Sequence, residues 1–424
     1  MSTHARFSCG RRLLPVLAIA TTVAAPVTAQ RAAPVAAQRP AAVSARSLAL
    51  ADSILEDAAA REAIPGAVLV VLQGDSIIHE RAFGYARLYD YGMQRSMAPR
   101  PMDTATIFDL ASVTKVMATT YAIMLLVDRG LIDVDAPAHR YLTELRGTHL
   151  DSITVRHLLT HSAGLAQWQP LYYHAATPQQ AYDFIRTLPL EWGVGADRHY
   201  SDLGFMLLGH MVERVSGRPL AAFVHEELYA PLGLRTTTFL PKQRGLTGFA
   251  ATSHGNPYER RMVHDTAFGY DYDGDPHAWS GWREYTLEGE VNDGNAWHAH
   301  GGVAGHAGLF STGRELATLL NVLLDGGVHE GRRIVDAAVI AGFMRKDRFG
   351  HGLGWQIPAN APEGSFAHNG FTGTYVIGVP RHDVAIVLLI NRQNLDVNDA
   401  GYYPGMGVRQ QVIRAILPEP GRSR

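Results

Sequence analysis

The chain places short apolar segments of strand type near its two ends and long apolar segments of helix type in its middle. Residues 67–72 and 76–86 carry apolar runs separated by Gly74-Asp75. A Gly-Asp pair between two such runs is typical of a tight turn, so this segment predicts a β-hairpin. Strand signals return after residue 350, at 352–357, 365–368, 373–379 and 384–391.

Helices are predicted mainly between these two groups of strands. The run from Val113 to Val127 is apolar almost all round, which is the pattern of a buried helix. Residues 203–215 place apolar side chains at helical spacing, and Gly217 is positioned to end that helix. Further helices are expected at 47–63, 316–324 and 407–416.

The order of these elements predicts the fold class α/β (α+β). The simplest packing joins the early hairpin to the late strands in one antiparallel sheet flanked by helices, with a mainly helical lobe inserted. We expect one catalytic domain at 47–417, with an α/β lobe at about 47–110 and 330–417 and a helical lobe at about 111–329. Ligand sites favour the interface between such lobes.

The N-terminal segment has the pattern of a secretory signal. Arginines precede an apolar stretch at 13–25, and residues 27–29 are small. This layout predicts a signal peptide at 1–29 and export from a bacterial cell, to the periplasm or the medium, with no stable membrane anchor after cleavage. The Ala/Pro-rich residues 30–46 are expected to form a disordered linker. The single cysteine, Cys9, would leave with the signal.

The charge balance narrows the class of partner. The 38 Lys and Arg residues nearly match the 40 Asp and Glu residues. Such a balance gives no sign of nucleic-acid binding, so we expect no nucleic-acid partner. The sequence does not indicate an oligomeric state.

The first candidate for chemistry is the pair Ser112 and Lys115, at the start of the apolar run. Residues three apart on a helix lie on one face, with Cβ atoms roughly 5–6 Å apart. A serine hydroxyl needs a nearby base to become a nucleophile. A buried lysine can be that base, because burial disfavours its charged form. The helix N-terminus adds N–H groups suited to a developing oxyanion.

Two further motifs follow in the chain. Tyr200-Ser201-Asp202 immediately precedes a predicted helix, and His368-Asn369-Gly370-Phe371 lies on or beside a late strand. Together with the serine-lysine pair, they resemble the β-lactamase-related serine hydrolases, which include class C β-lactamases and D-alanyl-D-alanine carboxypeptidases. The stretch 155–165 also looks like this family, and 301–312 resembles its penicillin-binding-protein 4B-like branch.

The resemblance implies a role for each matching residue. Ser112 would be the acylated nucleophile, Lys115 would take or relay its proton, and Tyr200 would complete the base. The backbone N–H groups of Ser112 and Phe371 would form the oxyanion hole, and the strand that carries His368, Asn369 and Gly370 would align the substrate. The implied activity is a serine acyl hydrolase that acts on esters or D-amino-acid peptides. Its partner would be a small-molecule or peptidoglycan-type acyl substrate.

Two positions depart from the family pattern. Asp202 stands where the tyrosine motif usually ends in Asn, and a carboxylate accepts hydrogen bonds whereas an amide also donates them. Asp202 could equally cap the helix that follows. His368 stands where β-lactamases carry Lys, and a neutral histidine supplies no fixed charge for a substrate carboxylate. In the family, histidine at this position accompanies esterases and D-amino-acid peptidases.

Other functions remain open alternatives. A class C-like β-lactamase and a non-catalytic module that senses peptidoglycan would share the fold. Neither a metal nor another cofactor is expected, although His298, His300 and His306 lie close together in the chain. No His-Glu-x-x-His motif accompanies them. The Tyr/Trp/His/Gly-rich stretch 253–300 is expected to be a long ordered excursion near the cleft.

Overall fold

The computed structural model describes residues 42–268, 272, 274–397 and 403–417, and the statements below concern these residues. The predicted signal peptide and most of the predicted linker lie outside them. Every element described belongs to one compact unit, Pro40–Arg424. Helix α1 (Ala45–Ala60) begins within the range expected for the linker, where the Ser44 side chain accepts a hydrogen bond from the backbone N–H of Ser47.

A six-stranded antiparallel sheet forms the centre of this unit, in the order β11-β12-β13-β1-β2-β3. The strands are β1 (Gly66–Gln73), β2 (Ser76–Asp90), β3 (Gln94–Pro101), β11 (Phe366–Asn369), β12 (Thr374–Val379) and β13 (Val384–Ile390). The predicted hairpin is confirmed, because β1 pairs with β2 on either side of Gly74-Asp75. β1 also pairs with β13, which joins the early and late strands in one sheet.

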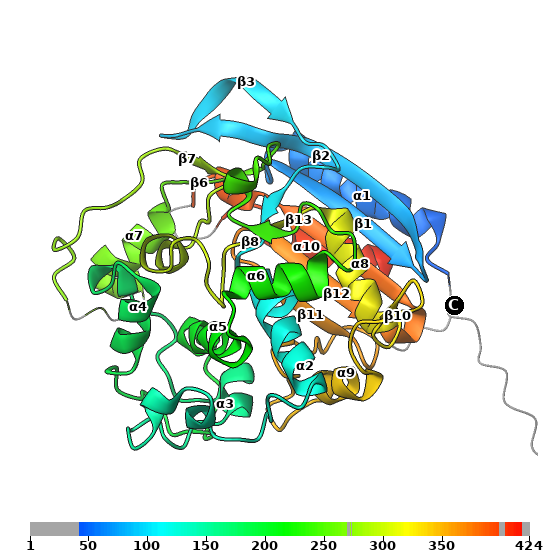
Figure 1. The fold of residues 1–424 in the computed structure, drawn as a ribbon. Helices are drawn as coiled ribbons and strands as arrows, with labels where there is room; N and C mark the ends of the chain where they lie inside the picture. The colour runs from blue at the N-terminus through cyan, green and yellow to red at the C-terminus, as the bar shows by residue number, and fades with distance from the viewer. Residues whose placement is uncertain (1–41, 269–271, 273, 398–402, 418–424) are drawn as a thin grey trace, which may run out of the picture. The chain divides into compact units, whose positions relative to one another are not determined.

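The sheet is covered on both faces because its strands are apolar on both sides. In β1, Val68 and Val70 pack in the core that contains α8 (Gly313–Leu324). Leu69 and Val71 point the other way, into the core with α1 and α10 (Val408–Ile416). Figure 1 shows this layering, with α8 on one side of the sheet and α1 and α10 on the other. Successive strand residues face opposite sides, so one strand serves two cores.

Most of the remaining helices lie between β3 and β11 in the chain and form the predicted inserted region (Figure 1). They are α2 (Tyr121–Asp128), α3 (Val155–Leu159), α4 (Pro178–Ile185), α5 (Asp202–Ser216), α6 (Leu220–Val224) and α7 (Pro257–His264). α9 (Ala337–Met344) lies beyond the expected end of the helical lobe at about 329, yet it packs against α2. α8 also falls within the range expected for the helical lobe, yet it packs against β1, β12 and β13. The predicted class, an antiparallel sheet flanked by helices with an inserted helical region, is confirmed.

The described residues also form three small sheets outside the central one. The first has the order β4-β8-β5, the second pairs β6 with β7, and the third pairs β9 with β10. Their strands are β4 (Phe108–Asp109), β5 (Thr238–Phe239), β6 (Ala251–His254), β7 (Thr286–Glu288), β8 (Leu309–Ser311), β9 (Val328–His329) and β10 (Arg332–Arg333). β4 leads directly into the helical segment that carries Ser112, so the first sheet fixes where that segment starts.

The predicted buried helix runs through Ala111–Asp128. It starts as a 3₁₀ turn at Ala111–Val113, continues as a π-helical segment at Lys115–Thr120, and ends as α2. By length and composition it is the helix, among the described residues, that could span a membrane, but 83% of it is buried inside the protein. Burial of this kind belongs to a core helix, as the apolar pattern predicts.

Candidate active site

The turn before Ser112 is held in an unusual backbone conformation. Ala111 has a φ of 45°, a left-handed value that costs a non-glycine residue energy. The carboxylate of Asp109 stabilises it, because Oδ1 accepts a hydrogen bond of 2.9 Å from the backbone N–H of Ala111. Asp109 is fully buried, and burial raises its pKa to about 6. Asp109 therefore holds the backbone turn that positions Ser112.

This turn is also tied to the late strands. The Thr372 hydroxyl donates to the carbonyl of Asp109 at 2.8 Å, and the Thr374 hydroxyl donates to the carbonyl of Leu110 at 2.9 Å. Gly370 lies so close to Leu110 and Thr374 that a side chain there would collide with both. The predicted strand motif thus lies directly beside the predicted nucleophile.

Lys115 is fully buried and points at Ser112. Its Nζ donates to Ser112 Oγ at 3.0 Å and to the carbonyl of His306 at 3.2 Å. It also forms an ion pair of 2.7 Å with Asp202, whose side chain is 18% exposed. Burial lowers the pKa of Lys115, but its interactions with Asp202 and with Tyr200 outweigh burial and raise it above its ordinary value. The resting lysine is therefore a cation, contrary to the expectation from burial alone.

The ring of Tyr200 also lies next to the Lys115 ammonium. Lys115 Nζ is 5.0 Å from the centre of its ring, and the ring also packs against His161 at 4.4 Å. Burial raises the pKa of the Tyr200 phenol, while its interactions with Lys115 and Ser112 oppose that rise without cancelling it. Tyr200 is therefore a neutral phenol at neutral pH, placed among the other two predicted residues.

Asp202 does not cap α5. The cap is Ser201, whose side chain accepts a hydrogen bond from the backbone N–H of Gly204. Asp202 is the first residue of the helix, and its carboxylate forms the ion pair with Lys115. The alternative that Asp202 serves as the helix cap is wrong, and its side chain is part of the site.

His368 is buried at the start of the strand motif, on β11. Its Nδ1 donates to the carbonyl of Asn369 at 2.9 Å, and its ring lies 6.3 Å from that of Tyr200. Burial lowers the pKa of His368 to about 3, with a further contribution from Lys115. The imidazole is thus neutral near pH 7. Among the described residues, the backbone N–H of Phe371 donates no hydrogen bond, so it is free to bind an oxyanion.

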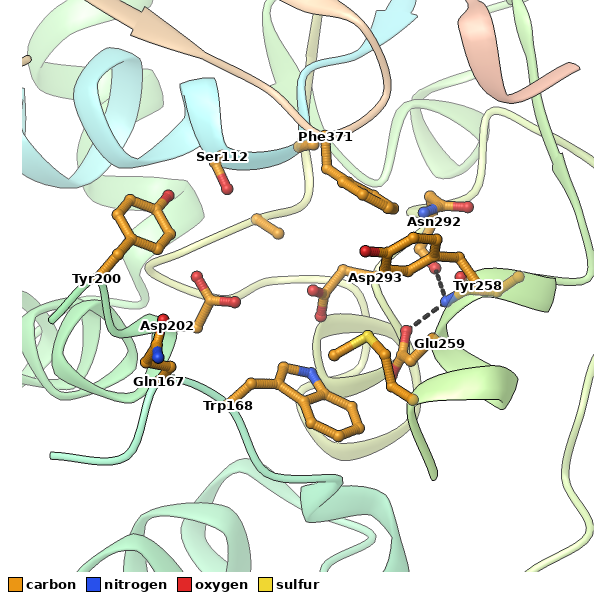
Figure 2. A pocket seen from close by; sticks show the side chains of 14 residues that line it. Ser112, Gln167, Trp168, Tyr200, Asp202, Tyr258, Glu259, Asn292, Asp293 and Phe371 are labelled. Carbon is orange, nitrogen blue, oxygen red and sulfur yellow. Dashed lines mark hydrogen bonds between the residues drawn. The ribbon is translucent and has the colours of Figure 1, made fainter. Parts of the chain in front are cut away.

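A cavity of about 190 Å³ opens beside Ser112. Figure 2 shows the wall of the cavity, where the carboxylates of Asp202 and Asp293 lie between the rings of Tyr200 and Tyr258. Ser112, Tyr200, Asp202 and Phe371 are the predicted residues that line it. The other lining residues are Ala111, Gln167, Trp168, Asn256, Tyr258, Glu259, Met262, Asn292, Asp293 and Ala307.

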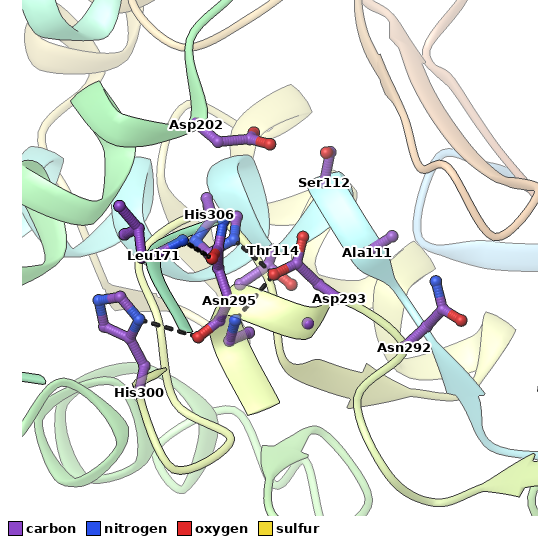
Figure 3. A network of polar contacts seen from close by, with 12 residues as sticks. Ala111, Ser112, Thr114, Leu171, Asp202, Asn292, Asp293, Asn295, His300 and His306 are labelled. Carbon is purple, nitrogen blue, oxygen red and sulfur yellow. Dashed lines mark hydrogen bonds and ion pairs between the residues drawn. The ribbon is translucent and has the colours of Figure 1, made fainter. Parts of the chain in front are cut away.

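Several of these residues were not singled out from the sequence. Glu259 and Asp293 lie in the stretch 253–300, which was expected to form an ordered excursion near the cleft. The spacing of its residues matches no catalytic or ligand-binding motif. Asp293 accepts a hydrogen bond of 2.9 Å from His306 Nε2 (Figure 3). Burial raises the pKa of Asp293, but His306 and Lys115 together lower it to about 2. Burial raises the pKa of Glu259 to about 8.

Asp202, Asp293 and His306 also have the composition of a metal site. One ligand atom from each lies within 4.8 Å of the others. However, Asp202 is already paired with Lys115, and Asp293 with His306 (Figure 3). A divalent cation would have to compete with the lysine ammonium for the same carboxylate, so these residues do not fit a metal well.

Comparison with known proteins agrees with this geometry. The family model described as Beta-lactamase matches residues 51–405. An N-acetylmuramyl-L-alanine amidase from Bacillus subtilis (strain 168) is 33% identical over 394 residues, which cover 85% of this chain and 84% of that protein. A protein of Salmonella schwarzengrund named "Putative D-alanyl-D-alanine carboxypeptidase" is also 33% identical, over 81% of this chain and 82% of its own length.

A solved structure with the same fold is that of EstCE1, a hydrolase with promiscuous acyltransferase activity. It superposes with a TM-score of 0.65 at 20% identity, and the match covers 88% of this chain and 98% of that one. The matched region includes Ser112, Lys115, Tyr200 and the strand motif. The chain therefore belongs to the β-lactamase family of serine hydrolases.

Proposed function

We propose that the protein hydrolyses esters or D-amino-acid peptides through an acyl-enzyme on Ser112, with Lys115 and Tyr200 as proton carriers. The observation that carries this proposal is the hydrogen bond of 3.0 Å between Lys115 Nζ and Ser112 Oγ at the wall of the cavity. Binding alone would need no nucleophile with a buried amine beside it.

The charges suggest how the serine loses its proton. Because Lys115 rests as a cation, it must release a proton before it can accept one. Asp202, 2.7 Å from the lysine nitrogen, is the nearest acceptor. As Ser112 Oγ attacks the acyl carbon, one lysine proton moves to Asp202 and the serine proton moves to Lys115. Proton balance is kept, and the ammonium stays beside the reacting oxygen.

The later steps use the neutral phenol and the backbone. Tyr200 can give its proton to the leaving group and later recover one from the water that attacks the acyl-enzyme. The backbone N–H groups of Ser112 and Phe371 would bind the oxyanion of both tetrahedral intermediates. Each role follows from the family resemblance and is compatible with the positions of these groups around the cavity.

The electrostatics favour acyl substrates without a carboxylate next to the reacting bond. His368 is neutral near pH 7 because of its lowered pKa, and Asp202 and Asp293 line the cavity. An anionic β-lactam would meet carboxylates rather than a free cation. The relatives named as an amidase and as a carboxypeptidase support the inclusion of amide bonds in the substrate class.

The test is a substrate panel with the purified protein. A neutral short-chain ester, a D-alanyl amide and nitrocefin are compared by kcat/KM, with Ser112→Ala as the control. We expect the ester and the amide to be hydrolysed faster than nitrocefin. Faster turnover of nitrocefin would replace the proposal with a class C-like β-lactamase. If no substrate is hydrolysed and no acyl-enzyme forms, the protein is a non-catalytic member of the fold.

A further inference from the structure

The family-like stretch 155–165 supplies no group to the proposed chemistry, yet it contains a buried histidine beside the site. The stretch forms α3 and the loop that follows it, and His161 lies in that loop with a φ of 57°. This left-handed conformation is uncommon for residues other than glycine. The His161 residue is only 5% exposed. A polar ring held in this way is normally fixed by hydrogen bonds.

The hydrogen bonds of His161 go to the backbone on both sides of Tyr200. The backbone N–H of His199 donates to the carbonyl of His161 at 2.9 Å. On the other side, Nδ1 of His161 lies 3.0 Å from the backbone nitrogen of Ser201 and 3.2 Å from its backbone oxygen. One neutral tautomer accepts from that N–H, and the other donates to that carbonyl. His161 therefore holds the residues immediately before and after the tyrosine.

The ring of His161 also contacts the ring of Tyr200. The two ring centres are 4.4 Å apart, with a tilt of 31° between the planes. The same imidazole lies 5.1 Å from the ring of Phe205, a fully buried residue of α5. In Figure 2 the phenol oxygen of Tyr200 points toward Ser112. Contacts with both the backbone and the ring limit how far the phenol can turn away from that serine.

The charge of His161 suits a supporting role. Burial lowers its pKa well below the ordinary value, and the charges of Arg198 and Lys115 lower it further. The imidazole is therefore neutral at pH 7. A neutral side chain can hold Tyr200 without placing a second cation near the Lys115 ammonium.

We propose that His161 is a positioning residue, which holds the Tyr200 phenol where it can protonate the leaving group. The inference rests on the proposed function, because it explains how one of its proton carriers is placed. It has a specific kinetic consequence. The ethoxide of an ethyl ester needs a proton as it leaves, whereas p-nitrophenolate leaves without one, so a misplaced phenol should slow the first ester far more than the second.

Three substitutions at position 161 separate the hydrogen bond from the ring. His161→Asn places an amide close to where Nδ1 lies, and asparagine adopts the left-handed conformation readily. His161→Gln carries its amide one bond further out, and His161→Phe keeps a ring but makes no hydrogen bond. The acetate esters of p-nitrophenol and of ethanol have the same acyl group, and kcat/KM reports the acylation step for each.

We expect the loss to depend on the leaving group. In His161→Gln and His161→Phe, kcat/KM should fall at least about tenfold more for ethyl acetate than for p-nitrophenyl acetate, since general acids contribute 10²- to 10⁴-fold. His161→Asn should stay within about threefold of the wild type for both esters, because it keeps the hydrogen bond. Either of the first two variants suffices if the other does not fold.

A control variant tests whether a merely structural role would give the same result. Asn394 is also fully buried, and its Oδ1 accepts hydrogen bonds from the backbone N–H groups of Leu88 and Tyr89. Asn394→Ala should lower the free energy of unfolding but change kcat/KM for the two esters by the same factor. Equal losses for both esters in folded His161→Gln and His161→Phe, or a His161→Asn as impaired as they are, would overturn the proposal.

Two further measurements separate this inference from the proposed function. Tyr200→Phe should show the same dependence on the leaving group, and equal losses for both esters there would overturn the proposed role of the phenol itself. Crystal structures of the variants then decide by themselves whether His161 positions Tyr200. The phenol oxygen should move by at least about 1 Å in His161→Gln and by less than about 0.5 Å in His161→Asn. An unmoved phenol in His161→Gln would overturn the inference whatever the kinetics show.

Discussion

The active site has two sides that differ in origin and in electrostatics. The reacting side consists of Ser112, Lys115, Tyr200 and Asp202, and its charges form one tight group in which a buried cation meets a carboxylate at 2.7 Å. The pocket side consists of Tyr258, Glu259, Asn292 and Asp293, and it contains aromatic surface, a protonated acid and acceptor oxygens. The first side is built to move a proton and the second to hold a polar group.

This difference implies that substitutions on the two sides should have different effects on catalysis. Changes on the reacting side should reduce turnover of every substrate, because they affect the bond-making step. Changes on the pocket side should alter which substrate is preferred. The predictions below start with the largest expected effect.

The largest effect is expected from removing the proton carriers. Lys115→Ala and Tyr200→Phe should each reduce kcat by about 10²- to 10⁴-fold, as loss of a general acid or base does. Because the two groups act as a unit, the double variant should be little worse than the more damaging single one. Steady-state kinetics of the three variants with one neutral ester decides this. Additive losses in activation free energy would mean that the groups act independently.

The next effect concerns the ion pair that keeps Lys115 charged. In Asp202→Asn, burial still lowers the pKa of the lysine but the carboxylate no longer raises it. The lysine pKa should fall by about 1–3 units, so kcat/KM should drop at pH 7 and recover as pH rises. The wild type should show no such rise between pH 7 and 9. Asp202→Glu, which keeps the charge, is the control, and identical pH profiles for wild type and Asp202→Asn would contradict the proton path.

His368 sits at the boundary between the two sides and should affect selectivity more than rate. His368→Lys would add a cation that can bind a substrate carboxylate, with a charge-assisted hydrogen bond of about 1.5–3 kcal/mol. The ratio of nitrocefin to ester kcat/KM should rise by roughly 10- to 100-fold, whereas the neutral control His368→Gln should not raise it. Because the pKa of His368 is lowered to about 3, the wild-type ratio should stay constant from pH 5 to 8.

The last effect concerns stability rather than turnover, and it comes from the pocket side. The folded protein keeps Glu259 protonated up to a pKa of about 8, while an unfolded glutamate loses its proton near pH 4.3. Between these values the folded state binds more protons, so this group's contribution to stability is present at low pH and declines as pH rises, by up to about 1.4 kcal/mol per pH unit. Urea unfolding at several pH values should show a shallower decline in Glu259→Gln. An equal slope in both proteins would mean that Glu259 is ionised when folded.

The sequence predicts the reacting side much better than the pocket side. Ser112 and Lys115 are three residues apart on one helical segment, so local geometry alone brings them together. The hairpin at β1 and β2 follows from two apolar runs and a turn signal, and the link from β1 to β13 follows from the order of strands and helices along the chain. Tyr200 and His368 are identified because their motifs follow Ser112 and Lys115 in the order typical of the family. Their distance along the chain does not reveal which residues lie next to them in the fold.

The pocket side depends on contacts between distant parts of the chain. Glu259 and Asp293 lie in a stretch without periodicity, and only the fold brings them to one cavity. The charge of Lys115 was predicted wrongly for the same reason, since burial is visible in an apolar pattern but the approach of Asp202 is not. The left-handed turn at Ala111 likewise requires Asp109, whose partners at Asn292 and Thr372 come from far along the chain.

The measurement that tests the central claim most directly is intact-protein mass spectrometry after treatment with a fluorophosphonate or a slow ester. The wild type should gain the mass of one phosphonyl or acyl group, and peptide mapping should place that group on Ser112. Ser112→Ala should gain none under the same conditions. An adduct that persists in Ser112→Ala, or that maps to another residue, would show that Ser112 is not the nucleophile.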